Sequence, residues 1–123
     1  MTAPPRQPPA DDAALAALEA LVREIDRCTG ELHLARERAE VLLAHRRTGS
    51  PWLDIVSAEA RPLVVERISS VLSGLARAGS VWRKAQAHAL QDERVSINRI
   101  AALYGVTRQR ISALLREPAP GGG

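Results

Sequence analysis

A proline-free run from Asp11 to Arg47 constrains the fold more than any other part of this chain. Apolar residues recur along it in alternating steps of four and three, so they line one side of a helix with no charged residue among them. This pattern is typical of a helix that packs lengthwise on a partner, and such a helix would be about 55 Å long. The residues of this predicted seam are Ala14, Leu18, Leu21, Ile25, Cys28, Leu32, Ala35, Ala39 and Leu42.

Two partners for this seam are open. A second copy of the helix would give a homodimer, which we favour because the rest of the chain is a poor match for so long a seam. A fold-back onto the rest of the chain would give a helical hairpin, which suits the additional apolar residues beside the seam. Thr29-Gly30 is a place where the helix can break, since Gly costs about 1 kcal/mol relative to Ala in a helix. The residues expected to hold the homodimer are Leu18, Leu21, Ile25, Leu32, Ala35 and Leu42.

Further helices are predicted after this run. Gly49 ends the long helix, and Ser50-Pro51 opens a short one with Ser as the cap and Pro in the first turn. An apolar stripe predicts a helix over Leu63–Ala78, which Gly79 stops before Ser80 caps the next. No segment alternates in the manner of a strand, so the predicted class is all-α. The expected organisation is a disordered tail at 1–10, a long helical segment at 11–47, connecting helices at 50–79, a helix-turn-helix domain at 80–117 and a tail at 118–123.

Several function classes find no support in the sequence. Cys28 is the single cysteine, and the three histidines are scattered without a second ligand one turn away, so neither a metal nor another cofactor is expected. No phosphate-binding glycine loop or nucleophile–base pair is visible, so we expect no enzyme. The apolar runs are too short to span a membrane, and the N-terminus lacks the features of a secretory signal, so we expect a cytoplasmic, nucleoid-associated protein. Sixteen of the seventeen basic residues are Arg, which indicates a GC-rich bacterial genome.

Positive charge is concentrated near the C-terminus. Residues 11–47 carry eight acidic and six basic side chains, whereas residues 80–116 carry seven basic and two acidic ones. A surface that faces phosphates needs such an excess.

The same part of the chain predicts two helices that cross at a tight turn, from Ser96 to Arg116. Gly105 falls at the turn, where a positive φ favours Gly, and Thr107 can cap the helix that follows. The residues expected to pack between the two helices are Ile100, Ala101, Leu103, Val106, Ile111, Leu114 and Leu115.

This spacing is that of a helix-turn-helix, whose second helix enters the DNA major groove. Gln109 can pair with adenine, and Arg108 or Arg110 with guanine, while short hydroxyls suit the phosphate backbone. Arg83, Lys84 and Arg94 are looser candidates for phosphate contact, with a solvated face as the alternative. The residues expected to contact DNA are Thr107, Arg108, Gln109, Arg110, Ser112 and Arg116 on the second helix, with Asn98 and Arg99 on the first.

The segment Tyr104–Ile111, Tyr-Gly-Val-Thr-Arg-Gln-Arg-Ile, resembles region 4 of bacterial sigma factors and the helix-turn-helix of resolvases. The resemblance covers about Leu90–Arg116 and implies a bacterial DNA-binding regulator. Gln109 stands where the sigma pattern usually has Glu, so a different base preference is expected. We therefore expect a dimeric transcriptional regulator that binds double-stranded DNA. The alternative is an adaptor that binds RNA polymerase, a sigma factor or another regulator through the N-terminal helix.

Overall fold

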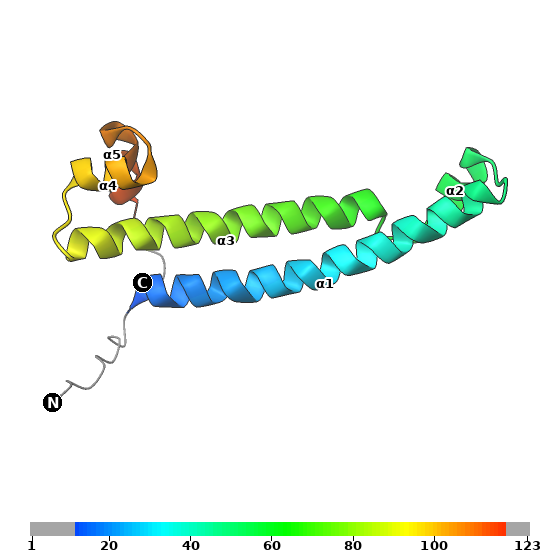
Figure 1. Cartoon of the computed structure of the whole chain (residues 1–123), viewed down its shortest axis with the longest axis horizontal. Coiled ribbons are helices and arrows are strands. Elements are labelled where there is room, and N and C mark those ends of the chain that lie inside the picture. The colour runs from blue at the N-terminus through cyan, green and yellow to red at the C-terminus, as the bar shows by residue number, and fades with distance from the viewer. Residues whose placement is uncertain (1–11, 118–123) are drawn as a thin grey trace, which may run out of the picture. The chain divides into compact units, whose positions relative to one another are not determined.

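The computed structural model describes residues 12–117, which form five helices and no strand. In chain order these are α1 (Ala13–Arg47), α2 (Trp52–Ala58), α3 (Val64–Asp92), α4 (Ile97–Tyr104) and α5 (Arg108–Arg116) (Figure 1). The predicted all-α class, with a long N-terminal helix followed by shorter ones, is confirmed. The predicted tails at 1–10 and 118–123 lie outside the described residues.

Helix α1 begins and ends where the sequence predicts. The Leu15 amide donates to Asp12 Oδ1 over 2.9 Å, which satisfies one of the free N–H groups of the first turn. At the other end the Ser50 amide donates to the His45 carbonyl, and Gly49 adopts a φ of 99°. The helix does not break at Thr29-Gly30, where the Thr29 hydroxyl donates to the Ile25 carbonyl over 2.9 Å. A single Gly weakens a helix without stopping it.

The predicted boundaries around α2 and α3 need correction. Pro51, not Ser50, occupies the position before the first turn of α2, and no side chain caps it. Helix α3 passes through Gly79 and Ser80 to Asp92, so the predicted stop and new start there are wrong. Gly79 keeps helical geometry because α3 contains no proline and the helical hydrogen bonds continue on both sides of Gly79. Trp52 in α2 is 55% exposed, and the Arg46 guanidinium lies 5.0 Å from its ring centroid.

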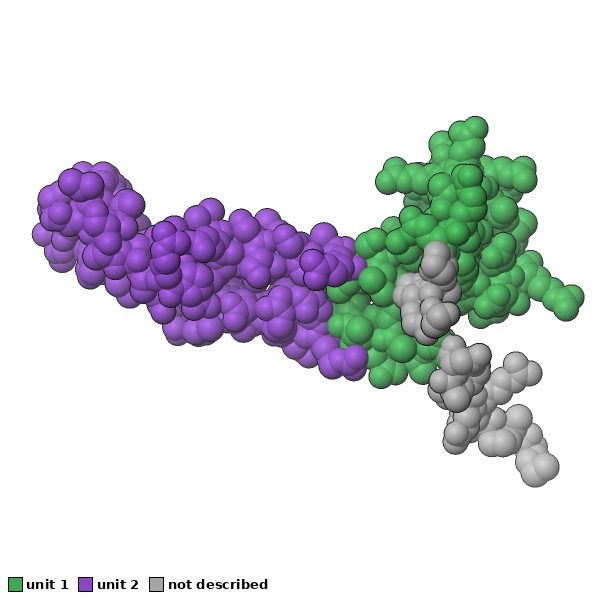
Figure 2. All heavy atoms as spheres, turned by 180° about the vertical axis from the view of Figure 1, so that it is seen from behind, with its two compact units in different colours: residues 1–21, 78–123 green, residues 22–77 purple. Residues whose placement is uncertain are grey.

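The chain divides into two compact units (Figure 2). Unit 1 comprises residues 1–21 and 78–123, and unit 2 comprises residues 22–77. The units do not follow one another in sequence, because α1 and α3 each pass from one unit into the other.

In unit 2, α1 and α3 form an antiparallel hairpin (Figure 1). The Cys28 thiol lies 3.9 Å from the Val71 carbonyl, and Arg67 pairs with Glu31 at 3.0 Å. A methyl group added to Gly74 would lie 2.5 Å from Glu24 Oε1. Positions 24, 28 and 31 thus meet 74, 71 and 67, which is the order that antiparallel chains require. The absence of a side chain at Gly74 lets the two helices approach with the Glu24 carboxylate between them.

The predicted dimer seam of α1 is only partly available to another molecule. Ala35 is buried and so cannot reach a partner, whereas Leu42 is half-buried and lines a pocket inside unit 2. Leu18, Ile25 and Leu32, by contrast, are between 39% and 48% exposed. The residues that turn inward include two members of the predicted seam, Cys28 and Ala35, together with Ala17, Glu24 and Glu31. The hairpin, which was the second interpretation of the seam, is therefore present in unit 2, and the homodimer stays a prediction.

Candidate nucleic-acid interface

The helix pair α4–α5 in unit 1 is fixed by its own caps. Ser96 Oγ accepts from the Arg99 amide over 3.1 Å at the start of α4, and Thr107 Oγ1 accepts from the Arg110 amide over 3.2 Å at the start of α5. Between the helices Gly105 adopts φ 67°, and the Val106 amide donates to the Ala101 carbonyl over 3.1 Å. Both predicted roles, of Gly105 as the turn residue and of Thr107 as the cap, are confirmed.

A small core holds the two helices together. Ile100, Ala101 and Ile111 are almost completely buried in one cluster. The prediction that these three residues pack between the two helices is therefore confirmed. Leu103, predicted to join them, is 58% exposed. The inward face of α4 is centred between Ile100 and Ala101, so Leu103 points away from it and Tyr104 takes the core position. The half-buried residues packed around this core are Leu90, Val95, Ile97, Tyr104, Val106 and Leu115.

Seven of the eight predicted DNA-contacting residues are exposed on this helix pair. Asn98 and Arg99 are exposed on α4, and Ser112 is half-buried on α5. No ion pair joins the arginines of α5 to any carboxylate within residues 12–117. The Arg116 guanidinium donates to the Ser112 carbonyl over 3.4 Å, which keeps it along the last turn of α5. The exposed residues of α5 and its cap are Thr107, Arg108, Gln109, Arg110, Ala113 and Arg116.

The chain matches no protein-family model, no curated protein sequence and no solved structure. The arrangement of its own residues therefore carries the argument for function.

Two of the three looser basic candidates, Arg83 and Lys84, make side-chain contacts within the chain. The Arg83 guanidinium lies 4.3 Å from the ring centroid of Tyr104, which ties α3 to the end of α4. Burial raises the pKa of the Tyr104 hydroxyl, so the ring meets Arg83 in its neutral form. Lys84 pairs with Glu117 just beyond α5. Arg94 adopts φ 66° where α3 ends, and its amide donates to the Gln91 carbonyl over 2.9 Å.

The contacts that Glu117 makes with α3 could not be predicted from the sequence. His88 Nε2 lies 2.9 Å from the Glu117 carbonyl oxygen, so α3 holds the chain at the end of α5 through both His88 and Lys84. These residues are about thirty positions apart in the chain, and no local pattern links them. Ala87 is fully buried in α3, and the sequence does not predict this because Ala occurs on every side of this helix.

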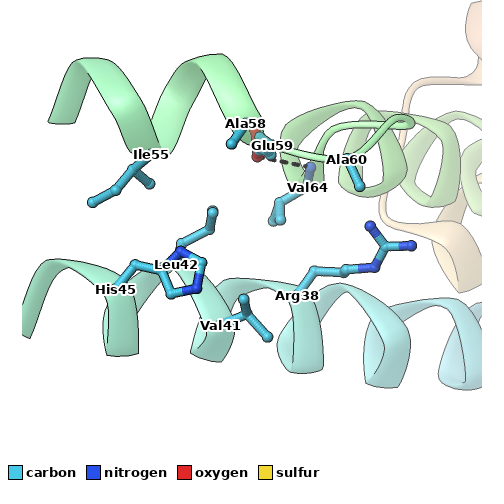
Figure 3. Close-up of a pocket in the computed structure, with 9 residues that line it drawn as sticks. All are labelled: Arg38, Val41, Leu42, His45, Ile55, Ala58, Glu59, Ala60 and Val64. Carbon is cyan, nitrogen blue, oxygen red and sulfur yellow. Dashed lines mark hydrogen bonds between the residues drawn. The ribbon is translucent and has the colours of Figure 1, made fainter. Parts of the chain in front are cut away.

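Unit 2 contains a pocket of about 140 Å³ between the end of α1, α2 and the start of α3 (Figure 3). Its walls are mostly apolar, and Arg38 and His45 extend from α1 beside it. The Glu59 carboxylate accepts from the Val64 amide over 3.4 Å and so serves the start of α3. Within residues 12–117, no three His, Cys, Asp or Glu side chains gather as a metal site, and no helix has the length and apolar character needed to cross a membrane.

Proposed function

We propose that the chain binds double-stranded DNA in a sequence-specific manner through α4 and α5, and acts as a transcriptional regulator. The observation that carries this proposal is the outer face of α5, where Arg108, Gln109 and Arg110 stand exposed on the first turn of a capped helix. A helix that enters the major groove reads bases with residues near its N-terminus.

The chemistry of this face fits base recognition and phosphate contact together. Gln109 presents the amide pair that adenine accepts, and a guanidinium offers two parallel donors to guanine. The Thr107 oxygen accepts from the backbone, which leaves its hydroxyl hydrogen free to donate to a phosphate. Arg99 and Asn98 are exposed on α4, and we expect them to contact the backbone of the duplex.

The alternative function, that of a protein adaptor, is favoured by the exposed apolar residues of α1 and not by α5. Leu15, Val22 and Ile25 are all at least 39% exposed, whereas the described part of α5 exposes no large apolar side chain. A protein-docking surface is normally centred on aromatic or large apolar residues. The face of α5 is therefore better suited to nucleic acid than to protein.

Selection of bound duplexes from a random double-stranded library tests the proposal. We expect enrichment of one sequence motif by the wild-type chain, and its loss with an Arg108→Ala/Gln109→Ala/Arg110→Ala variant. Absence of any enriched motif with the wild-type chain would contradict sequence-specific binding, and would favour the adaptor function.

A further inference from the structure

The hairpin of unit 2 exposes large apolar residues on both of its long helices. Each of them is between 39% and 63% exposed, and Leu75 beside them is half-buried. Together they expose on the order of 500 Å², as much as the largest apolar patch of a typical monomeric protein. We call this set the α1–α3 face, and its members are Val22, Ile25 and Leu32 on α1 and Val65, Ile68 and Leu72 on α3.

The two rows lie on the same side of the hairpin. On α1, Ile25 and Leu32 each follow by one residue a position that contacts α3, namely Glu24 and Glu31. On α3, Ile68 and Leu72 in the same way follow Arg67 and Val71. One residue is a rotation of about 100° in an α-helix. Antiparallel helices wind in opposite senses when viewed from one end, so the same offset turns both rows toward one side.

The hairpin keeps its small residues inside and its large ones outside. The buried residues of its two long helices are Cys28, Ala35 and Val71, and the remaining inward positions include Gly74 and the pair Glu31–Arg67. Such a seam buries few large apolar side chains completely, and the α1–α3 face could add to the buried apolar surface. A unit of this size needs a larger core than its seam provides.

A second copy of the chain fits this face. From Ile68 to Ala76, α3 has no charged side chain on any side, although a helix exposed to water normally has a charged outer face. Charged residues of both signs lie at the rim of this face on α1, where Asp26 comes two positions after Glu24 and Arg36 comes one position after the buried Ala35. A rim of mixed sign can pair with itself across a two-fold axis, where a rim of one sign would repel its copy. A standard interface buries roughly 800 Å² of each partner, and a little over half of that area is apolar, so an exposed apolar area of about 500 Å² is sufficient.

We propose that the α1–α3 face packs against the same face of a second copy, so that the two hairpins of the dimer form a four-helix bundle. This interface includes α3 and differs from the α1 seam expected from the sequence, since it uses Ile25 and Leu32 but leaves Ala35 and Leu42 inside each hairpin. The dimer does not depend on DNA binding. If both proposals hold, the dimer carries two α5 helices, and the selected DNA site should contain two half-sites.

Sedimentation equilibrium of the full chain tests the interface. We compare the wild type with Leu32→Glu on α1 and Leu72→Glu on α3, because burial of an unpaired carboxylate is costly. Leu34→Glu is the matched control, since Leu34 is 43% exposed against 48% for Leu32 but lies on another side of α1. Circular dichroism confirms that each variant keeps its helices. We expect a wild-type dimer, a dissociation constant raised about tenfold or more by each face variant, and no comparable change for Leu34→Glu.

Each contrary outcome overturns a defined part of the proposal. A wild-type chain that stays monomeric over a roughly hundredfold concentration range would exclude a second copy as the occupant. A dimer weakened by Leu32→Glu but not by Leu72→Glu would place the interface on α1 alone. A dimer weakened equally by Leu34→Glu would place it on a different side of the hairpin.

Discussion

Arg67 Nη1 donates a hydrogen bond to Glu31 Oε2 over 3.0 Å, and joins α3 to α1 where the two side chains are only 17% and 32% exposed. Arg67 Nε is buried beside this bond without a partner in the described part of the chain. Loss of the carboxylate would leave a half-buried guanidinium poorly satisfied. We expect Glu31→Ala to lower the free energy of unfolding by about 1–3 kcal/mol.

The control for this prediction is Glu40→Ala, which removes the exposed pair between Glu40 and Arg36 at 3.1 Å. A solvent-exposed pair contributes about 0.5 kcal/mol or less, so this variant should unfold close to the wild-type midpoint. Urea unfolding followed by circular dichroism measures both changes. Equal effects of the two substitutions would show that the Glu31–Arg67 pair does not stabilise the hairpin.

Two glycines should respond to alanine in opposite directions. At Gly105, with φ 67°, a side chain strains the left-handed backbone, so Gly105→Ala should lower stability by about 1 kcal/mol. At Gly79, in the middle of α3, an added methyl group meets no atom within 4 Å, so Gly79→Ala should raise stability by about 0.5–1 kcal/mol. Thermal unfolding measures both. A loss of stability with Gly79→Ala would argue against the continuous helix.

The cap of α5 gives a third prediction. Thr107→Ala removes the oxygen that accepts from the Arg110 amide, and should cost about 1 kcal/mol. Thr107→Ser keeps this oxygen and should retain most of the stability, which separates the cap from the packing of the methyl group. The rate of hydrogen exchange of the Arg110 amide measures the loss of this hydrogen bond directly. Faster exchange in both variants alike would show that the hydroxyl is not the stabilising group.

A fourth prediction concerns pH. The hydrogen bond from Arg27 holds the pKa of the Glu24 carboxyl below its usual value, against the opposing effect of burial. A lowered folded-state pKa adds stability above the ordinary carboxyl pKa, and this is lost as the pH falls through the lowered value. The wild type should therefore exceed Glu24→Gln in unfolding midpoint at neutral pH, and the gap should narrow in acid. A gap that does not change with pH would contradict the role of the charge.

Local signals in the sequence predicted the helix pair well. Gly105 adopts a left-handed backbone conformation and the Thr107 hydroxyl caps α5, and both effects involve only neighbouring residues. The turn and the cap of α4–α5 could therefore be predicted from the sequence. The partner of α1 could not be placed in the same way. The predicted seam contains the inward Cys28 and Ala35 as well as the outward Ile25 and Leu32. Glu24 and Glu31 repeat inward with the same heptad period, so the apolar pattern did not show which part of the seam faces α3. At Gly74 the absence of a side chain leaves room for the Glu24 carboxylate, which no local pattern in α1 predicts.

The measurement that tests the account most directly is a titration of the selected duplex at several salt concentrations, read by fluorescence anisotropy. Arg110→Ala probes α5, and Arg36→Ala is the control because Arg36 lies on α1 in unit 2. We predict that the logarithm of the wild-type affinity falls linearly with that of the salt concentration, that Arg110→Ala weakens binding by about 1–3 kcal/mol, and that Arg36→Ala leaves it unchanged. Wild-type binding that is insensitive to salt, or equal losses for the two variants, would contradict DNA recognition by α5.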